Sequence, residues 1–224
     1  AEQARTMVFQ TAEALRRADA GETGAYALLR ILTPLIKFRA CRDARKLTGD
    51  AMEVRGGCGY IEDWADPRLL RDAHLGSIWE GTSNIVALDV LRAIRREASL
   101  TALDVHLRGL LADTPLHAAA RGVFEDTLSR ATARAARAAE AGAGGEVIAR
   151  QVGSALYHLT TATAMAWEAG GMRSARRMRL AQWVLRQRVL PQDPLGGDEA
   201  EPAWLPGLLA PAQDDGDVAG VNLL

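Results

Sequence analysis

The sequence is poor in the residues that build disulfide-rich or metal-binding folds. Its 224 residues include two cysteines, Cys41 and Cys58, and four scattered histidines, none with the spacing of a disulfide framework or a metal site. No apolar run approaches the roughly 18–20 residues of a membrane helix, and no signal peptide opens the chain. These absences predict a cytoplasmic protein in a reducing setting, without bound metal and without membrane association.

The sequence also lacks the alternation of apolar and polar residues that marks half-buried strands, and it has no lysine in its second half. The net charge is -1, which does not indicate a polyanion partner for the chain as a whole. The charge is nevertheless uneven, since residues 101–190 hold 12 arginines and 7 acids whereas residues 191–224 hold 7 acids and no base. The middle is therefore locally positive and the tail locally negative.

Helical composition and apolar spacing are what the sequence does contain. Residues 2–20, 25–54, 82–98, 101–112, 115–141, 146–170 and 171–190 are predicted to be helices, so the predicted fold class is all-α. Pro34 should kink its helix or mark a boundary, and the glycines at 142–145 and 170–171 should separate the later helices. Residues 56–60 are expected to form a tight turn or a close backbone approach. Residues 61–79 are expected to form a loop with a short helix, and residues 191–224 an irregular acidic tail.

A carboxylate next to a helix start is the first candidate for chemistry. Glu80 lies between Trp79 and Gly81, just before the helix that opens at Thr82 or Ser83. An apolar neighbour would desolvate Glu80 and favour a general base near neutral pH, and Gly81 would let a ligand approach the backbone. On spacing alone, capping of the helix or balancing of its dipole is the commoner role for such a glutamate.

Two further clusters could bind anions. The backbone amides of residues 56–59, with three glycines in four positions, could cradle a phosphate, although a plain turn is the commoner reading. A run of arginines without an intervening acid could contact phosphates, although a solvated basic face is more frequent. These arginines are Arg173, Arg176, Arg177, Arg179, Arg186 and Arg188.

In combination and order, several motifs resemble the C-terminal signature of acyl-CoA dehydrogenases. These are residues 51–60, Arg68, the Arg71-Asp72 pair and residues 78–85. Glu53 in place of the usual glutamine, Trp79 in place of the usual tyrosine, and residues 33–37 and 88–92 are similar to the AidB-like alkylation-response branch. The resemblance is strong over residues 25–97, architectural over residues 98–190 and absent from the tail.

The resemblance implies roles for individual residues. Glu80 matches the base that removes the proton α to the thioester, after which a hydride passes from the β carbon to FAD. Trp79 and Gly81 would line the substrate pocket. The segment that contacts FAD held by a neighbouring subunit would comprise Glu53, Gly56, Gly57 and Gly59, with Thr82 and Asn84 near the cofactor. Glu53 would be unfavourable beside a pyrophosphate unless it points away or meets an arginine such as Arg55.

The resemblance also implies an organisation and partners. Residues 1–98 would be the family's C-terminal helical domain, truncated at its start, followed by an AidB-like helical extension at 99–190 and the tail at 191–224. The expected partners are an acyl-CoA, a second copy in a homodimer or tetramer, and an electron-transfer flavoprotein. The chain is expected to be a fragment that is inactive by itself.

Two alternatives to a metabolic dehydrogenase stay open. One is an AidB-like flavoprotein with weak dehydrogenase activity that binds double-stranded DNA through the arginine run. The other is a helical interaction module without activity of its own.

Overall fold

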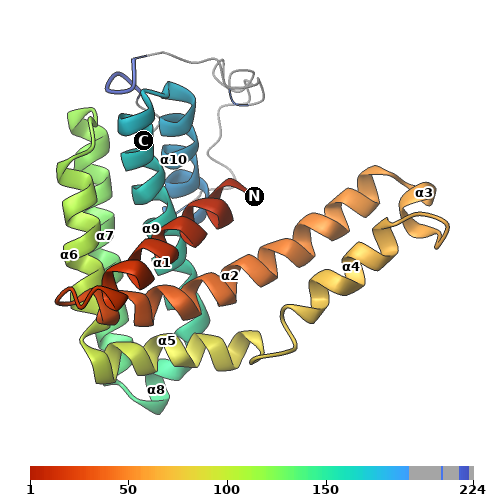
Figure 1. Ribbon diagram of the computed structural model, residues 1–224, viewed down its shortest axis with the longest axis horizontal. Coiled ribbons are helices and arrows are strands. Elements are labelled where there is room, and N and C mark those ends of the chain that lie inside the picture. Colours follow the sequence, from red (N-terminus) through yellow and green to blue (C-terminus); the bar gives the residue numbers. More distant parts are fainter. Residues whose placement is uncertain (192–207, 209–216, 222–224) are drawn as a thin grey trace.

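The computed structural model describes residues 1–191, 208 and 217–221, and within them every regular element is a helix (Figure 1). The all-α prediction is therefore confirmed. The predicted irregular tail falls largely outside the described residues. The helices are α1 (Glu2–Asp19), α2 (Ala25–Val54), α3 (Gly57–Tyr60), α4 (Asp66–Leu75), α5 (Ser83–Glu97), α6 (Ser99–Ala112), α7 (Ala118–Glu140), α8 (Ala143–Glu146), α9 (Ala149–Met172) and α10 (Ala175–Arg188).

Helix α9 is the centre of the bundle. It packs against α1, α2, α5, α6, α7 and α10, and its residues from Leu156 to Ala166 are buried on all sides, as expected for a helix enclosed by others. Its many alanines and threonines let the surrounding helices approach closely. One hydrophobic cluster includes Met7, Leu35 and Leu185, so the extension after residue 98 shares a core with the helices before it. No helix among the described residues is long and apolar enough to cross a bilayer.

An arm leaves this bundle. The C-terminal half of α2, together with α3 and α4, extends away from the other helices in Figure 1, and α4 packs back along α2. At its tip, Gly56 has a φ of +59°, and residues 57–60 form the one-turn helix α3 where a tight turn or a close backbone approach was predicted. A Cβ on Gly59 would lie 2.3 Å from the Met52 carbonyl oxygen, so a residue with a side chain could not pack there.

At Pro34 the boundary that was one of the two predicted alternatives is absent, and the predicted break at Gly170 and Gly171 is wrong, because tertiary packing overrides the local preference. Helix α2 continues through Pro34 from Ala25 to Val54, since Ile31, Leu32 and Leu35 anchor it in the core. Helix α9 continues through Gly170 and Gly171 and ends only at Arg173, which has a φ of +52°. Gly170 instead permits a close approach, because a Cβ there would lie 2.6 Å from Pro115 Cδ.

A buried histidine makes the stability of the bundle depend on pH. His158 is 4% exposed, and its Nδ1 lies 3.0 Å from the Gln3 amide nitrogen, which donates to the neutral ring. Burial, reinforced by Arg39 and Arg188, lowers the pKa of His158 to about 3. The unfolded chain therefore takes up a proton near its ordinary pKa that the folded chain does not, and stability decreases as pH falls.

We expect this histidine alone to remove about 2 kcal/mol from the free energy of unfolding between about pH 7.5 and pH 5. Urea unfolding of the parent and of His158→Gln at both pH values measures the difference, and the variant should lose correspondingly less stability on acidification. His74→Gln, at an exposed histidine, is the matched control. An equal loss in the parent and in His158→Gln would contradict the assignment.

Candidate functional site

The backbone before α5 places Glu80 in an unusual conformation. The chain leaves α4 through hydrogen bonds from the N–H groups of Ile78 and Trp79 to the Leu75 carbonyl, at 2.9 and 3.2 Å. Glu80 then has a φ of +55° and Gly81 a φ of +103°. A left-handed residue other than glycine costs roughly 1–2 kcal/mol. Such conformations persist where the surroundings impose them, and they cluster at functional sites.

Lys37 of α2 holds this segment in place. Its Nζ donates to the carbonyl oxygens of Gly76 at 2.6 Å and Trp79 at 3.1 Å. The lysine thus fixes the peptide that immediately precedes Glu80. This contact could not be predicted from local sequence beyond the likeness of residues 33–37 to the AidB-like branch, since the partners are 39 and 42 residues apart.

The Glu80 carboxylate does not cap α5. Within the described chain it has no hydrogen-bond or ion-pair partner, and its side chain is exposed. Thr82 is the N-cap residue, which was one of the two predicted alternatives. Its side chain makes no hydrogen bond to the helix. The expected desolvation of Glu80 by Trp79 is absent from this chain, because Trp79 is itself 59% exposed.

Apolar side chains close to Glu80 in the sequence are not covered by the rest of the described chain. Ile78, Trp79 and Ile85 each expose more than half of their surface, while Asn84 is also exposed. Exposed apolar surface of this kind marks a ligand-binding or protein-binding surface. The segment before α5 and the start of α5 therefore present one exposed carboxylate together with exposed apolar side chains.

The glycine segment lies at the other end of α4 from Glu80 (Figure 1). Helix α4 has 10 residues, which corresponds to about 15 Å, so the two candidate sites do not form one pocket in this chain. Gly56 and Gly57 are exposed with open space beside them, whereas Gly59 is packed on Met52. Glu53 is exposed. It does not pair with Arg55, which was one of the two predicted ways to accommodate its charge, because Arg55 pairs with Asp66 at 2.9 Å and lies over the Trp64 ring.

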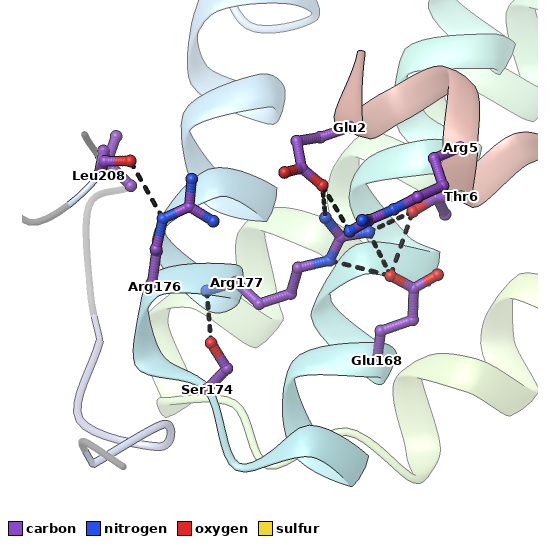
Figure 2. A network of polar contacts seen from close by, with 8 residues as sticks. All are labelled: Glu2, Arg5, Thr6, Glu168, Ser174, Arg176, Arg177 and Leu208. Carbon is purple, nitrogen blue, oxygen red and sulfur yellow. Dashed lines mark hydrogen bonds and ion pairs between the residues drawn. The ribbon is translucent and has the colours of Figure 1, made fainter. Parts of the chain in front are cut away.

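The arginine run does not form one exposed surface. Arg177 is 4% exposed, and its guanidinium pairs with Glu168 and Glu2 and contacts the Thr6 hydroxyl (Figure 2). Its inclusion in a DNA-contacting surface is therefore wrong, since it joins α10 to α1 and α9 in the interior. Its partners lie outside helical spacing, so no local signal could identify them.

The other five arginines of the run differ in exposure. Arg176 Nε donates to the Leu208 carbonyl at 3.0 Å. Arg176 and Arg179 are half-buried, whereas the exposed members are Arg173, Arg186 and Arg188.

Comparison with known proteins identifies the first part of the chain. Residues 1–95 match the family described as acyl-CoA dehydrogenase, C-terminal domain. The chain is 38% identical over 111 residues to acyl-CoA dehydrogenase family member 11 of Caenorhabditis elegans, covering 48% of this chain and 18% of that protein. It is 43% identical over 95 residues to AidB of Escherichia coli K12, covering 42% of this chain and 17% of that protein.

The likeness in structure extends beyond the matched domain. The crystal structure of Caenorhabditis elegans ACDH-11 in complex with C11-CoA aligns with a TM-score of 0.75 and 25% identity, covering 86% of this chain and 35% of that one. The chain thus spans less than a fifth of the two relatives matched by sequence. Residues 1–95 belong to the acyl-CoA dehydrogenase family as its C-terminal domain, in the branch that includes AidB.

Proposed function

We propose that this chain contributes one wall of the active site of an FAD-dependent acyl-CoA dehydrogenase, with Glu80 as the catalytic base. The observation that carries the proposal is an exposed, unpaired carboxylate on a left-handed residue whose preceding peptide is fixed by Lys37. A base that must reach a substrate needs a free carboxylate and a fixed position. The 224-residue chain would be inactive by itself, because its own residues leave Glu80 and the apolar side chains near it exposed.

The proposed reaction is the α,β-dehydrogenation of an acyl-CoA thioester. Glu80 takes the proton from the α carbon as that C–H bond breaks, and the hydride leaves from the β carbon as the carbon–carbon double bond forms. The Glu80 N–H donates to no acceptor among the described residues, so it is available to bind the thioester carbonyl and make the α proton more acidic. Trp79 and Gly81 line the acyl chain's path, and the relative ACDH-11 was solved with C11-CoA.

Some of the residues proposed to contact FAD have surroundings that suit a bound cofactor, and others do not. FAD, when bound, supplies the hydride acceptor. Gly56 and Gly57 have no heavy atom within 4 Å of a Cβ position, so a flat group can approach their backbone. Gly59 supports the turn through Met52 instead of touching a ligand, and Glu53 would have to point away from a phosphate. Thr82 and Asn84 present exposed side chains on the Glu80 side of α4.

The proposed second copy of the chain is inferred from exposed apolar surface on the arm. The tip of the arm is apolar and exposed at Tyr60 and Ile61, as a face covered by a second copy in a homodimer or tetramer would be. The glycine segment would then contact FAD bound to the second copy. A separate FAD site for this segment is consistent with the distance between the glycine segment and Glu80 within one chain. An electron-transfer flavoprotein is the proposed acceptor of the electrons.

Removing the Lys37 ammonium should slow the reaction without removing the base. In the flavin-loaded enzyme, we expect Lys37→Met to lower the rate of flavin reduction by about 10–100-fold, because a misplaced reacting group costs up to about that much. Lys37→Arg, which keeps donors for the Gly76 and Trp79 carbonyls, should recover part of the rate at unchanged acyl-CoA affinity. Stopped-flow absorbance of the flavin is the measurement.

The matched control for Lys37 is Lys46→Met, at the other lysine of α2, which pairs with Asp50 on the surface. It should leave the rate unchanged. A Lys37→Met enzyme that reduces flavin at the parent rate would show that the Lys37 hydrogen bonds do not position Glu80.

A second candidate function is DNA binding, and the exposed arginines of the extension favour it. Arg173, Arg186 and Arg188 are exposed, and Arg176 and Arg179 lie beside them in the sequence, so phosphate contacts without base recognition are the proposed mode. Arg177 is excluded by its burial.

A further inference from the structure

Four arginines converge on a pocket, and of these only Arg188 belongs to the arginine run proposed to contact DNA. The pocket measures about 450 Å³ and lies where α2, α9 and the end of α10 meet. Arg39 and Arg42 come from α2, Arg150 from α9 and Arg188 from α10. Arg39 and Arg42 are two and five residues after Lys37, which places them on the opposite side of α2 from the Glu80 segment.

Most of this positive charge is uncompensated. Arg39 pairs with Asp43 at 2.5 Å and reaches Ser154 Oγ at 3.4 Å. For Arg42, Arg150 and Arg188, no carboxylate in the described part of the chain lies within ion-pair distance. The Nε of Arg39 is buried and has no acceptor.

The positively charged arginines of the pocket also repel one another. Desolvation lowers the pKa of Arg42, and Arg150, Arg39 and Arg45 add to the effect, with Asp43 alone opposing it. Arg39 and Arg42 both lie over the Phe38 ring, at 5.9 and 5.8 Å from its centroid, which holds their guanidinium groups at the pocket wall. Positive groups held together in a partly desolvated place repel one another unless an anion enters.

We propose that this pocket binds a small ligand that carries two or more phosphate groups. Guanidinium groups bind phosphate oxygens in pairs of parallel hydrogen bonds, and four of them from three helices can enclose more than one phosphate. The volume falls within the range of about 300–1,000 Å³ typical of small-ligand pockets and exceeds what one inorganic phosphate fills. The convergence of the arginines and the buried Arg39 Nε favour a small group that enters the pocket over a duplex that lies across the surface.

Isothermal titration calorimetry of the 224-residue chain with pyrophosphate and tripolyphosphate tests this site. At low ionic strength we expect saturable binding with one ligand per chain, tighter for tripolyphosphate. Arg42→Ala should weaken binding by about tenfold or more, the usual effect of losing one charge-assisted hydrogen-bonding partner. Arg150→Glu should abolish it, and because Arg150 is exposed this variant should keep the parent's thermal unfolding curve.

Arg95→Ala and Arg96→Ala are the matched controls, since both arginines are exposed on α5 away from the pocket, and they should leave the affinity unchanged. Absence of saturable binding, or equal affinity in Arg150→Glu, would overturn the proposal. A short DNA duplex that displaces pyrophosphate at lower phosphate concentration than tripolyphosphate does would overturn the small-ligand assignment and make this a nucleic-acid site. The site does not depend on the proposed dehydrogenase function, because no acyl-CoA or flavin is present in the assay.

Discussion

Replacing Glu80 with glutamine should lower the rate at which an acyl-CoA reduces the flavin by about 10²–10⁴-fold, the usual cost of losing a general base. The amide has the shape of the carboxylate but cannot take up the α proton. No other carboxylate stands in the segment from Leu75 to Asn84. Stopped-flow bleaching of the flavin in the loaded enzyme measures the rate, and flavin content should stay at the parent value.

The matched control for Glu80 is Glu62→Gln. Glu62 is an exposed glutamate of the arm whose carboxylate pairs with Arg71 at 2.7 Å on the surface, and it has no part in the proposed site. Its replacement should leave flavin bleaching unchanged. If Glu80→Gln bleaches the flavin as fast as Glu62→Gln, another group is the base.

Arg177→Ala should destabilise the bundle by about 3–5 kcal/mol, because breaking a buried ion pair leaves its partner charge uncompensated. The Arg177 side chain is 5% exposed and that of Glu168 is 20% exposed. Loss of the guanidinium would strand the Glu168 carboxylate among α1, α9 and α10 (Figure 2). It would also release Glu2 and so loosen the start of α1 from the extension.

Urea unfolding followed by circular dichroism gives the change in the free energy of unfolding. Arg130→Ala is the control, since Arg130 pairs with Asp126 at 3.1 Å with both side chains more than half exposed. Such a surface pair contributes about 0.5 kcal/mol or less. An Arg177→Ala variant as stable as Arg130→Ala would show that the buried network does not hold the extension to the family domain.

The features that depend on local sequence could be predicted. Helix α2 and helix α5 have the predicted bounds to within a residue or two, because apolar spacing and helix-forming composition act over short distances. The importance of residues 78–84 came from the combination of motifs, since a glutamate before a helix is ordinarily a cap. The structure adds that Glu80 has left-handed backbone and caps nothing.

The features that depend on long-range contacts could not be predicted. Gly170 looks like a helix breaker until Pro115 is seen against it, and Pro34 looks like a boundary until the core on both sides is known. Arg177 belongs by sequence to a basic face, but its partners Glu2 and Thr6 are 175 and 171 residues away. The Lys37 contacts likewise join parts of the chain that no periodicity relates, and so does the pocket lined by arginines of α2, α9 and α10.

The central claim is that Glu80 removes the α proton of an acyl-CoA, and exchange of that proton with solvent tests it most directly. The flavin-loaded enzyme is incubated with an acyl-CoA in D₂O, and deuterium at the α carbon is followed by mass spectrometry. We predict that the parent enzyme and Glu62→Gln incorporate deuterium and that Glu80→Gln does not. Incorporation by Glu80→Gln at the parent rate would contradict the assignment of Glu80 as the base.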